Sequence, residues 1–101
     1  MKFRINYRIT DQGKFSSVLK TFSSLTPQQR ANDAGAGVTM IGRWHNLAGR
    51  DGVAIVESGD LAAVQRWILK WNSYMDCDCT PVMDDEECAA VGQQFLAETN
   101  L

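Results

Sequence analysis

The residues best suited to chemistry in this 101-residue chain are consecutive and lie in the segment 38–45, VTMIGRWH. The segment ends with Arg43, Trp44 and His45, and His45 is the only histidine of the chain. An imidazole titrates near neutral pH and can act as a general acid or base, whereas a guanidinium binds oxygenated groups. The composition of the segment predicts a strand. Because side chains alternate along a strand, Arg43 and His45 should share one face and Trp44 should lie on the other.

Two further polar residues complete the candidate site. Residues 2–9 alternate between polar and apolar side chains, which predicts a strand with one apolar face, and Asn6 lies on its polar face. Glu57 ends a second predicted strand, residues 53–57. A cavity with such groups could bind an anionic or oxygenated small molecule, with His45 as the candidate catalytic acid or base. The candidate ligand-binding residues are Asn6, Arg43, Trp44, His45 and Glu57. In the alternative interpretation, these charges pair across a dimer and are only structural.

A first helix should follow the N-terminal strand, capped by Thr10 or Asp11. Its buried stripe is predicted to be Phe15, Val18, Leu19 and Phe22. Pro27, at a first helical position, predicts a short polar helix over residues 27–33 that should lie on the surface. The Gly-rich residues 34–37 should form a hinge. They do not predict a phosphate-binding loop, because no strand precedes them and no Lys-Ser/Thr pair follows.

The second half of the chain predicts two more helices and a strand. Asp60 should cap one helix. Its buried stripe is predicted to be Leu61, Val64, Ile68 and Trp71, flanked by Trp67. Residues 76–83 predict a strand, and Pro81 favours an edge position because proline has no N–H for the ladder. Asp84 and Glu87 predict a capping box for a last helix. The apolar stripe of that helix is thin and consists of Cys88, Val91 and Phe95. Such a peripheral helix needs another surface to lie against.

The predicted order is strand, helix, strand, strand, helix, strand, helix. Two β-α-β units in this order predict an α+β, ferredoxin-like βαββαβ sandwich with an extra C-terminal helix, in a single domain of residues 1–101. The segment 53–57 is apolar on both faces, as expected for an interior strand that is covered on both sides. Because the helices cover only one face of such a sheet, we expect a homodimer in which two sheets face each other.

Composition and cysteine count narrow the class of protein. A formal net charge of −2 without a basic stripe argues against nucleic-acid binding. The chain has no apolar run near the ~20 residues of a membrane span and no signal-peptide pattern, so we expect a cytoplasmic protein without membrane contact. An odd number of cysteines fits a reduced intracellular chain. Cys77, Cys79 and Cys88, taken with His45, lack the spacing of recurrent zinc sites, so neither a metal nor a cofactor is predicted.

Several motifs resemble an uncharacterised family of small bacterial proteins that is known only as a domain of unknown function. These motifs are Gly42-Arg43-Trp44-His45, Glu57-Ser58-Gly59-Asp60, Trp67, Lys70-Trp71 and the closing segment 80–86 (TPVMDDE). The resemblance covers nearly the whole chain and is weakest over residues 23–36. It implies the dimeric α/β-barrel superfamily, which includes cofactor-free monooxygenases of antibiotic biosynthesis, haem-degrading enzymes, muconolactone isomerases and stress-responsive proteins. The family lends no established catalytic residues to this chain.

The same resemblance raises haem as a ligand. Haem-degrading relatives use an Asn on the first strand with a Trp and a His, and Asn6, Trp44 and His45 supply these residue types. In those enzymes the ligating His lies on the second helix, where this chain has tryptophan and lysine side chains instead. Since ligand placement decides haem chemistry, haem degradation is not predicted.

The leading hypothesis from the sequence is therefore a small-molecule-binding or cofactor-independent enzyme-like protein with a polar pocket near His45, between sheet and helices. The alternative is a non-catalytic homodimeric structural or regulatory domain. Alternation also leaves two arrangements of the pocket open. Either Arg43 and His45 form its polar side with Trp44 in the other layer, or Trp44 walls a pocket under the helices.

Overall fold

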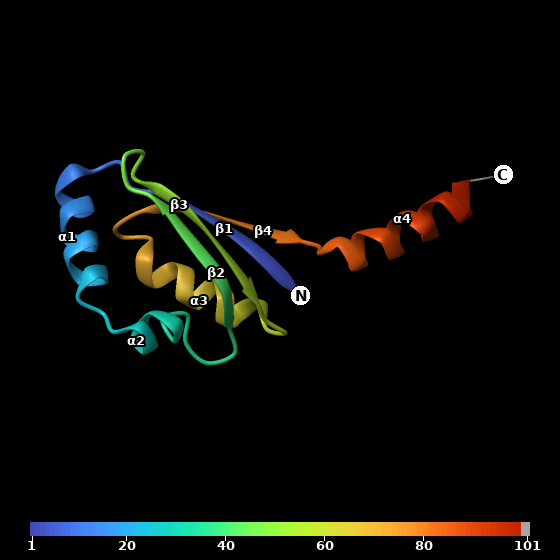
Figure 1. Cartoon of the computed structure of the whole chain (residues 1–101), viewed down its shortest axis with the longest axis horizontal. Helices are drawn as coiled ribbons and strands as arrows, with labels where there is room; N and C mark the ends of the chain where they lie inside the picture. The colour runs from blue at the N-terminus through green and yellow to red at the C-terminus, as the bar shows by residue number, and fades with distance from the viewer. Residues whose placement is uncertain (100–101) are drawn as a thin grey trace.

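The computed structural model describes residues 1–99 as a four-stranded antiparallel sheet with helices (Figure 1). The strands are β1 (Lys2–Arg8), β2 (Thr39–Asn46), β3 (Asp51–Glu57) and β4 (Asp76–Val82). The helices are α1 (Gln12–Ser23), α2 (Pro27–Ala31), α3 (Leu61–Trp71) and α4 (Asp85–Thr99). The strand order β2-β3-β1-β4 and the βαββαβ element order confirm the predicted α+β, ferredoxin-like fold with a C-terminal helix.

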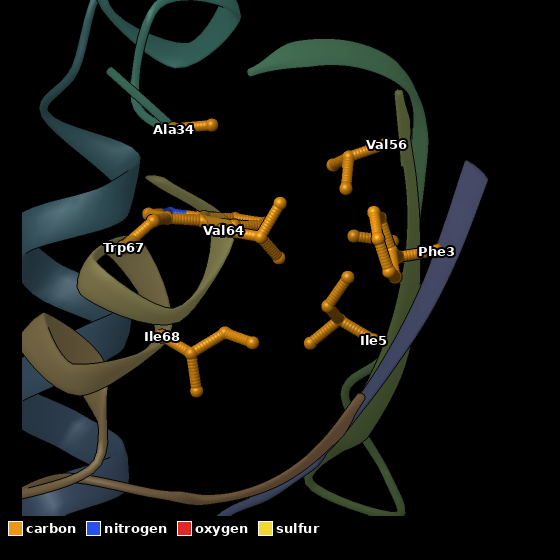
Figure 2. Packing of buried hydrophobic residues seen from close by; sticks show 8 residues of the cluster. Phe3, Ile5, Ala34, Val56, Val64, Trp67 and Ile68 are labelled. Carbon is orange, nitrogen blue, oxygen red and sulfur yellow. The ribbon is translucent and has the colours of Figure 1, made fainter. Parts of the chain in front are cut away.

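The core lies between one face of the sheet and α3. Figure 2 shows strand side chains such as Phe3 and Val56 pointing toward Val64 and Trp67 of α3. The buried apolar cluster is Phe3, Ile5, Ala34, Ala54, Val56, Val64, Trp67 and Ile68. Helix α1 lies on the same side of the sheet as α3. The opposite face, which we call the open face, carries Arg4, Asn6, Arg8, Ile41, Trp44, Val53, Ile55, Asp76, Asp78 and Thr80.

Several local predictions are confirmed. Strand β3 pairs with both β1 and β2, as expected for an interior strand, and β4 pairs only with β1, at the edge that Pro81 favours. Asp11 is the N-cap of α1. Asp84 and Glu87 form the predicted capping box, because the backbone N–H of each residue donates to the side chain of the other. Local sequence therefore determines where these elements begin and how the sheet edge is formed.

Two local predictions are wrong. The strand predicted over residues 53–57 is longer, because Asp51 and Gly52 begin β3, where Gly52 pairs with both Tyr7 and His45. The reason is pairing on both sides of β3, which extends the strand and leaves only residues 47–50 for the turn. In α3, Leu61 is 55% exposed, whereas Trp67 is 5% exposed and belongs to the core.

Helix α3 is rotated about its axis relative to the predicted orientation, and this rotation has an identifiable cause. The indole N–H of Trp67 donates a hydrogen bond to Asp33, a contact that holds the ring on the sheet side of the helix. The buried stripe consequently shifts to Ala63, Val64, Trp67 and Ile68, and Trp71 packs at its margin.

A bulge in β2 decides which side chains face the helices. The register with β3 shifts between Met40 and Gly42. Met40 packs against the core, and three positions later Arg43 also faces the helices, which strict alternation would forbid. Ile41 and Trp44 correspondingly point to the open face. The bulge thus places Arg43 and His45 on the same side as α1 and α3.

Among residues 1–99, no helix combines the length and the apolar character needed to cross a membrane.

Candidate functional site

A cavity of about 480 Å³ lies between the sheet and the helices α1 and α3. Its walls are mainly aliphatic and aromatic, which is the usual character of a site for a small organic ligand. Helix α1 contributes Phe15, Val18, Leu19 and Phe22. The sheet and α3 contribute Ile5, Tyr7, Ile9, Ala54, Trp67, Ile68, Trp71 and Cys77. The few polar groups are therefore conspicuous, and they come from β1, β2 and the segment after α2.

Helix α1 is the loosely packed wall of this cavity. Its four apolar side chains are the stripe predicted from the sequence, and they point into the cavity. None of the residues of α1 is buried, and Leu19 remains 38% exposed. An apolar stripe is normally covered by close packing. Here the cavity separates the stripe from the sheet, so a molecule in the cavity would bury surface that the chain itself leaves uncovered.

A hydrogen bond joins Tyr7 and His45 at the mouth of the cavity. The phenol oxygen of Tyr7 lies 2.6 Å from Nδ1 of His45. The two residues meet because each pairs with Gly52, from opposite sides of β3, and a Cβ at that position would collide with the Tyr7 ring. Phe22 of α1 packs on the imidazole, with 5.1 Å between the ring centroids. The pair is thus positioned by sheet register, and Phe22 packs against one side of an imidazole that remains exposed.

Both members of this pair are uncharged at neutral pH. Burial, with a smaller effect of the Arg43 charge, lowers the pKa of His45 below 6.5. Burial also raises the pKa of Tyr7 above 10.0. When the phenol donates to Nδ1 of a neutral imidazole, Nε2 carries the remaining proton and can donate to a ligand oxygen.

Arg43 is held in a compensated ion pair rather than presented to the cavity as a free charge. Its Nη1 lies 2.9 Å from Oδ2 of Asp33, and each side chain is only 13% exposed. Its Nη2 donates to the carbonyl oxygen of Arg30 at 2.9 Å. The guanidinium stacks over Phe22 of α1, 4.8 Å from the ring centroid. This arrangement links the segment after α2, β2 and α1 on one side of the cavity.

Asp33 is the central acceptor of this cluster, and sequence reasoning missed it. The prediction that residues 27–33 lie on the surface is wrong at this position. Asp33 accepts hydrogen bonds from Arg43 and, at 3.2 Å, from the indole N–H of Trp67. The surrounding segment is polar and shows no periodicity, so nothing in the sequence marks this carboxylate as half-buried. Helix α2 ends at Ala31, and the next residues lead Asp33 back toward the sheet.

The structure brings together only part of the predicted candidate site. Arg43 and His45 line the cavity under the helices. Trp44 also borders it, but its indole lies over Gly42 on the open face and is 60% exposed. Asn6 lies on the open face opposite Asp78.

Glu57 is also separate from the cavity. It ends β3, where its carboxylate lies 3.3 Å from Nζ of Lys2. Asn6 and Glu57 do not line the cavity. The bulge in β2 places Arg43 and His45 on the face of the sheet that the helices cover, whereas alternation along β1 and β3 places Asn6 and Glu57 on the open face.

The cysteines do not converge on the candidate site. Cys77 borders the cavity from β4, Cys79 follows on the same face, and Cys88 is exposed on α4. Burial raises the pKa of the Cys77 and Cys79 thiols. In the described part of the chain, residues 1–99, no three or more His, Cys, Asp and Glu side chains are grouped to hold a metal ion.

His45 provides a direct pH test of the site. Because its folded-state pKa is lowered, the unfolded chain binds more protons between the folded pKa and 6.5, and stability should fall as pH decreases through that window. Above pH 6.5 the contribution should be fully present. NMR titration of the single imidazole should give a lower pKa in the folded protein than in urea. Equal values in the two states would contradict a partly buried imidazole, and His45→Gln should remove this part of the pH dependence.

Comparison with known proteins identifies a family and no characterised relative. No curated protein matches the chain. The profile of a family described as a domain of unknown function, DUF3303, matches residues 1–96, which is nearly the whole described structure. The chain, with its ferredoxin-like fold and its cavity between sheet and helices, thus belongs to the DUF3303 family of domains of unknown function.

Proposed function

We propose that the protein binds a small, uncharged and largely apolar organic molecule that carries at least one hydrogen-bonding oxygen. The observation that carries this proposal is the hydrogen-bonded pair Tyr7–His45 at the mouth of a mainly apolar cavity, whose other polar side chains, Arg43 and Asp33, are paired with each other. Apolar walls favour a ligand with a hydrophobic body, and a few placed polar groups set its orientation. Nε2 of His45 is the group that would donate to the ligand oxygen.

The absence of net charge on the ligand follows from the state of the polar groups. Asp33 neutralises Arg43, and its carboxylate is shared with the Trp67 indole. An anionic ligand would have to compete for Arg43 and would leave Asp33 unpaired in a half-buried place, which is unfavourable. A neutral imidazole adds no positive charge. An oxygenated neutral molecule therefore fits better than an anion.

The same pair also supplies acid–base chemistry for a cofactor-independent reaction. In the other tautomer, Nδ1–H donates to the phenol oxygen of Tyr7, which orients the ring, and the lone pair of Nε2 can accept a proton from an acidic ligand group. In this proposal His45 is the catalytic base and Tyr7 is a positioning residue. The protein would then be a member of the dimeric α/β-barrel superfamily, in which a second copy covers the open face of the sheet.

A second candidate function is a non-catalytic homodimeric structural or regulatory domain. The observation that favours it is the complete pairing of Arg43 and Asp33, a contact that a purely structural ion pair would also make. This candidate predicts that the cavity binds no organic ligand. The two functions are therefore separated by a binding measurement.

Three matched probes test the proposal: naphthalene, 2-naphthol and naphthalene-2-carboxylate. Quenching of tryptophan fluorescence should report binding, because Trp67 and Trp71 line the cavity. We expect 2-naphthol to bind most tightly. Tyr7→Phe should weaken 2-naphthol binding about fivefold, the equivalent of one hydrogen bond of ~1 kcal/mol, and leave naphthalene binding unchanged.

Tyr74→Phe is the matched control, because Tyr74 lies outside the cavity on an exposed turn. It should change no affinity. Binding of the carboxylate as tight as that of 2-naphthol would contradict an uncharged ligand. Failure of all three probes to bind would favour the structural domain.

A further inference from the structure

Beyond the contact of Glu87 with Lys2 in its first turn, helix α4 is not packed against the sheet or the other helices of the described chain. It has no buried residue, and Figure 1 shows it extending from the end of β4 away from the sheet and the other helices. The described chain consequently has a long shape, 58 × 27 × 21 Å. The predicted stripe is fully presented to the outside, with Val91 48% and Phe95 60% exposed, and Leu96 beside it is 63% exposed.

The direction of α4 is fixed at its first turn. Only Met83 and Asp84 separate β4 from α4. Nζ of Lys2, on β1, lies 3.0 Å from Asp84 and 3.2 Å from Glu87, and it also contacts Glu57. Folding α4 back over its own sheet would move Asp84 and Glu87 away from Lys2 and break these contacts. In this arrangement, residues 1–99 leave the apolar side of α4 uncovered.

The open face of the sheet presents a surface of matching chemistry. Ile41 is 50% and Trp44 is 60% exposed, and they adjoin Val53 and Ile55 on the neighbouring strand. Beside this apolar strip lies Arg4, whose cross-strand neighbours are Ile55 and Thr80. Arg4 makes no ion pair with any residue between 1 and 99. The strip thus combines exposed apolar side chains with an uncompensated cation.

The acidic side chains of α4 complement Arg4, whereas Asp76 and Asp78 of the open face lie on β4, at the edge of the sheet away from β2. Residues 85–99 contain Asp85, Glu86, Glu87 and Glu98 and no lysine or arginine. The lengths also agree, because a 15-residue helix spans roughly 22 Å and a 7-residue strand spans roughly 23 Å. A helix of this size can cover the open face along its strands.

We propose that α4 is an exchange arm that lies on the open face of a second copy of this chain. Two copies lie antiparallel along their long axes, so that each α4 covers the other sheet with Val91 and Phe95 over Ile41 and Trp44. The interface is isologous and closes after two copies. This inference rests on the self-association proposed above, but it places a helix of the second copy over the open face and so replaces the contact between two sheets that a dimeric α/β-barrel would make.

Sedimentation equilibrium of the full chain tests the arm. The unaltered protein should be a dimer at micromolar concentration. Phe95→Ser should raise the dimer dissociation constant roughly tenfold or more, as expected for an aromatic anchor at an interface. Gln93→Ser, on the opposite side of α4, should leave it unchanged. Trp44→Ser, on the open face that α4 of the other copy would cover, should weaken the dimer as Phe95→Ser does.

The electrostatic part of the interface has its own test. Arg4→Glu should weaken the dimer, whereas Arg66→Glu, an exposed site on α3, should not. Equal effects of the two charge reversals would overturn the proposed contact between Arg4 and α4.

The outcomes separate the arm from the functions proposed above. A monomeric protein overturns both the arm and the dimer. A dimer weakened by Trp44→Ser but not by Phe95→Ser overturns the arm and leaves two sheets facing each other. Circular dichroism verifies that each variant folds. Binding of 2-naphthol to Phe95→Ser should be unchanged, so the cavity is tested independently of the arm.

Discussion

Asp33→Ala should lower the free energy of unfolding by about 3–5 kcal/mol, the range for breaking one side of a buried ion pair. Asp33 holds the Arg43 guanidinium at 2.9 Å and the Trp67 indole N–H at 3.2 Å. Removing the carboxylate leaves a half-buried cation and a buried donor without their partner. With both charged side chains only 13% exposed, solvent can do little to compensate. Urea unfolding followed by tryptophan fluorescence measures the effect.

The same experiment includes two comparisons. Glu86→Gln removes an exposed carboxylate on α4 and should change stability by less than about 0.5 kcal/mol. The double variant Asp33→Leu with Arg43→Met should recover part of the loss, because two apolar groups leave no charge unpaired. A loss below about 1 kcal/mol for Asp33→Ala, a value typical of an exposed pair, would show that the pair does not hold the cavity wall together.

Val18→Trp should weaken ligand binding roughly tenfold or more while the protein stays folded. Val18 points from α1 into the cavity, and α1 is the wall that packs least closely. An indole at this position fills space that a ligand would occupy, so the affinity for 2-naphthol should fall roughly tenfold or more. Stability should be unchanged or slightly raised, because the added apolar surface enters an existing cavity rather than a filled core.

Lys20→Trp is the control for this variant. It adds the same side chain to the exposed side of α1 and should leave binding unchanged. Isothermal titration with 2-naphthol measures both variants. Unchanged affinity of Val18→Trp would place the ligand elsewhere and would remove the support for the cavity as the binding site.

The sequence by itself determined the elements and much of their arrangement. Helix starts follow from a side chain within one turn of the groups it caps, as at Asp11 and Asp84. The interior place of β3 follows from apolar residues on both of its faces, and the edge place of β4 from the missing N–H of Pro81. These features are local, so a short window of sequence contains the physical cause.

The site was only partly predictable, because its membership depends on register. Arg43 and His45 have side chains suited to chemistry and share one face, as alternation requires. Which face they share is decided by the bulge after Met40, and a bulge depends on how β2 pairs with β3. Asn6 and Glu57 are polar side chains of a similar chemical type, but the same register places both outside the cavity.

Only the tertiary structure decided the remaining features. Asp33 became the partner of Arg43 because the chain after α2 returns to the sheet, a path that no periodicity encodes. Trp67 displaced Leu61 from the buried stripe because Asp33 orients its indole. The apolar stripe of α4 indicates that this helix needs another surface to lie against. The ion pairs of Lys2 with Asp84 and Glu87 direct the helix away from its own sheet. In each case the cause is a contact between segments distant in sequence, which residue spacing alone does not contain.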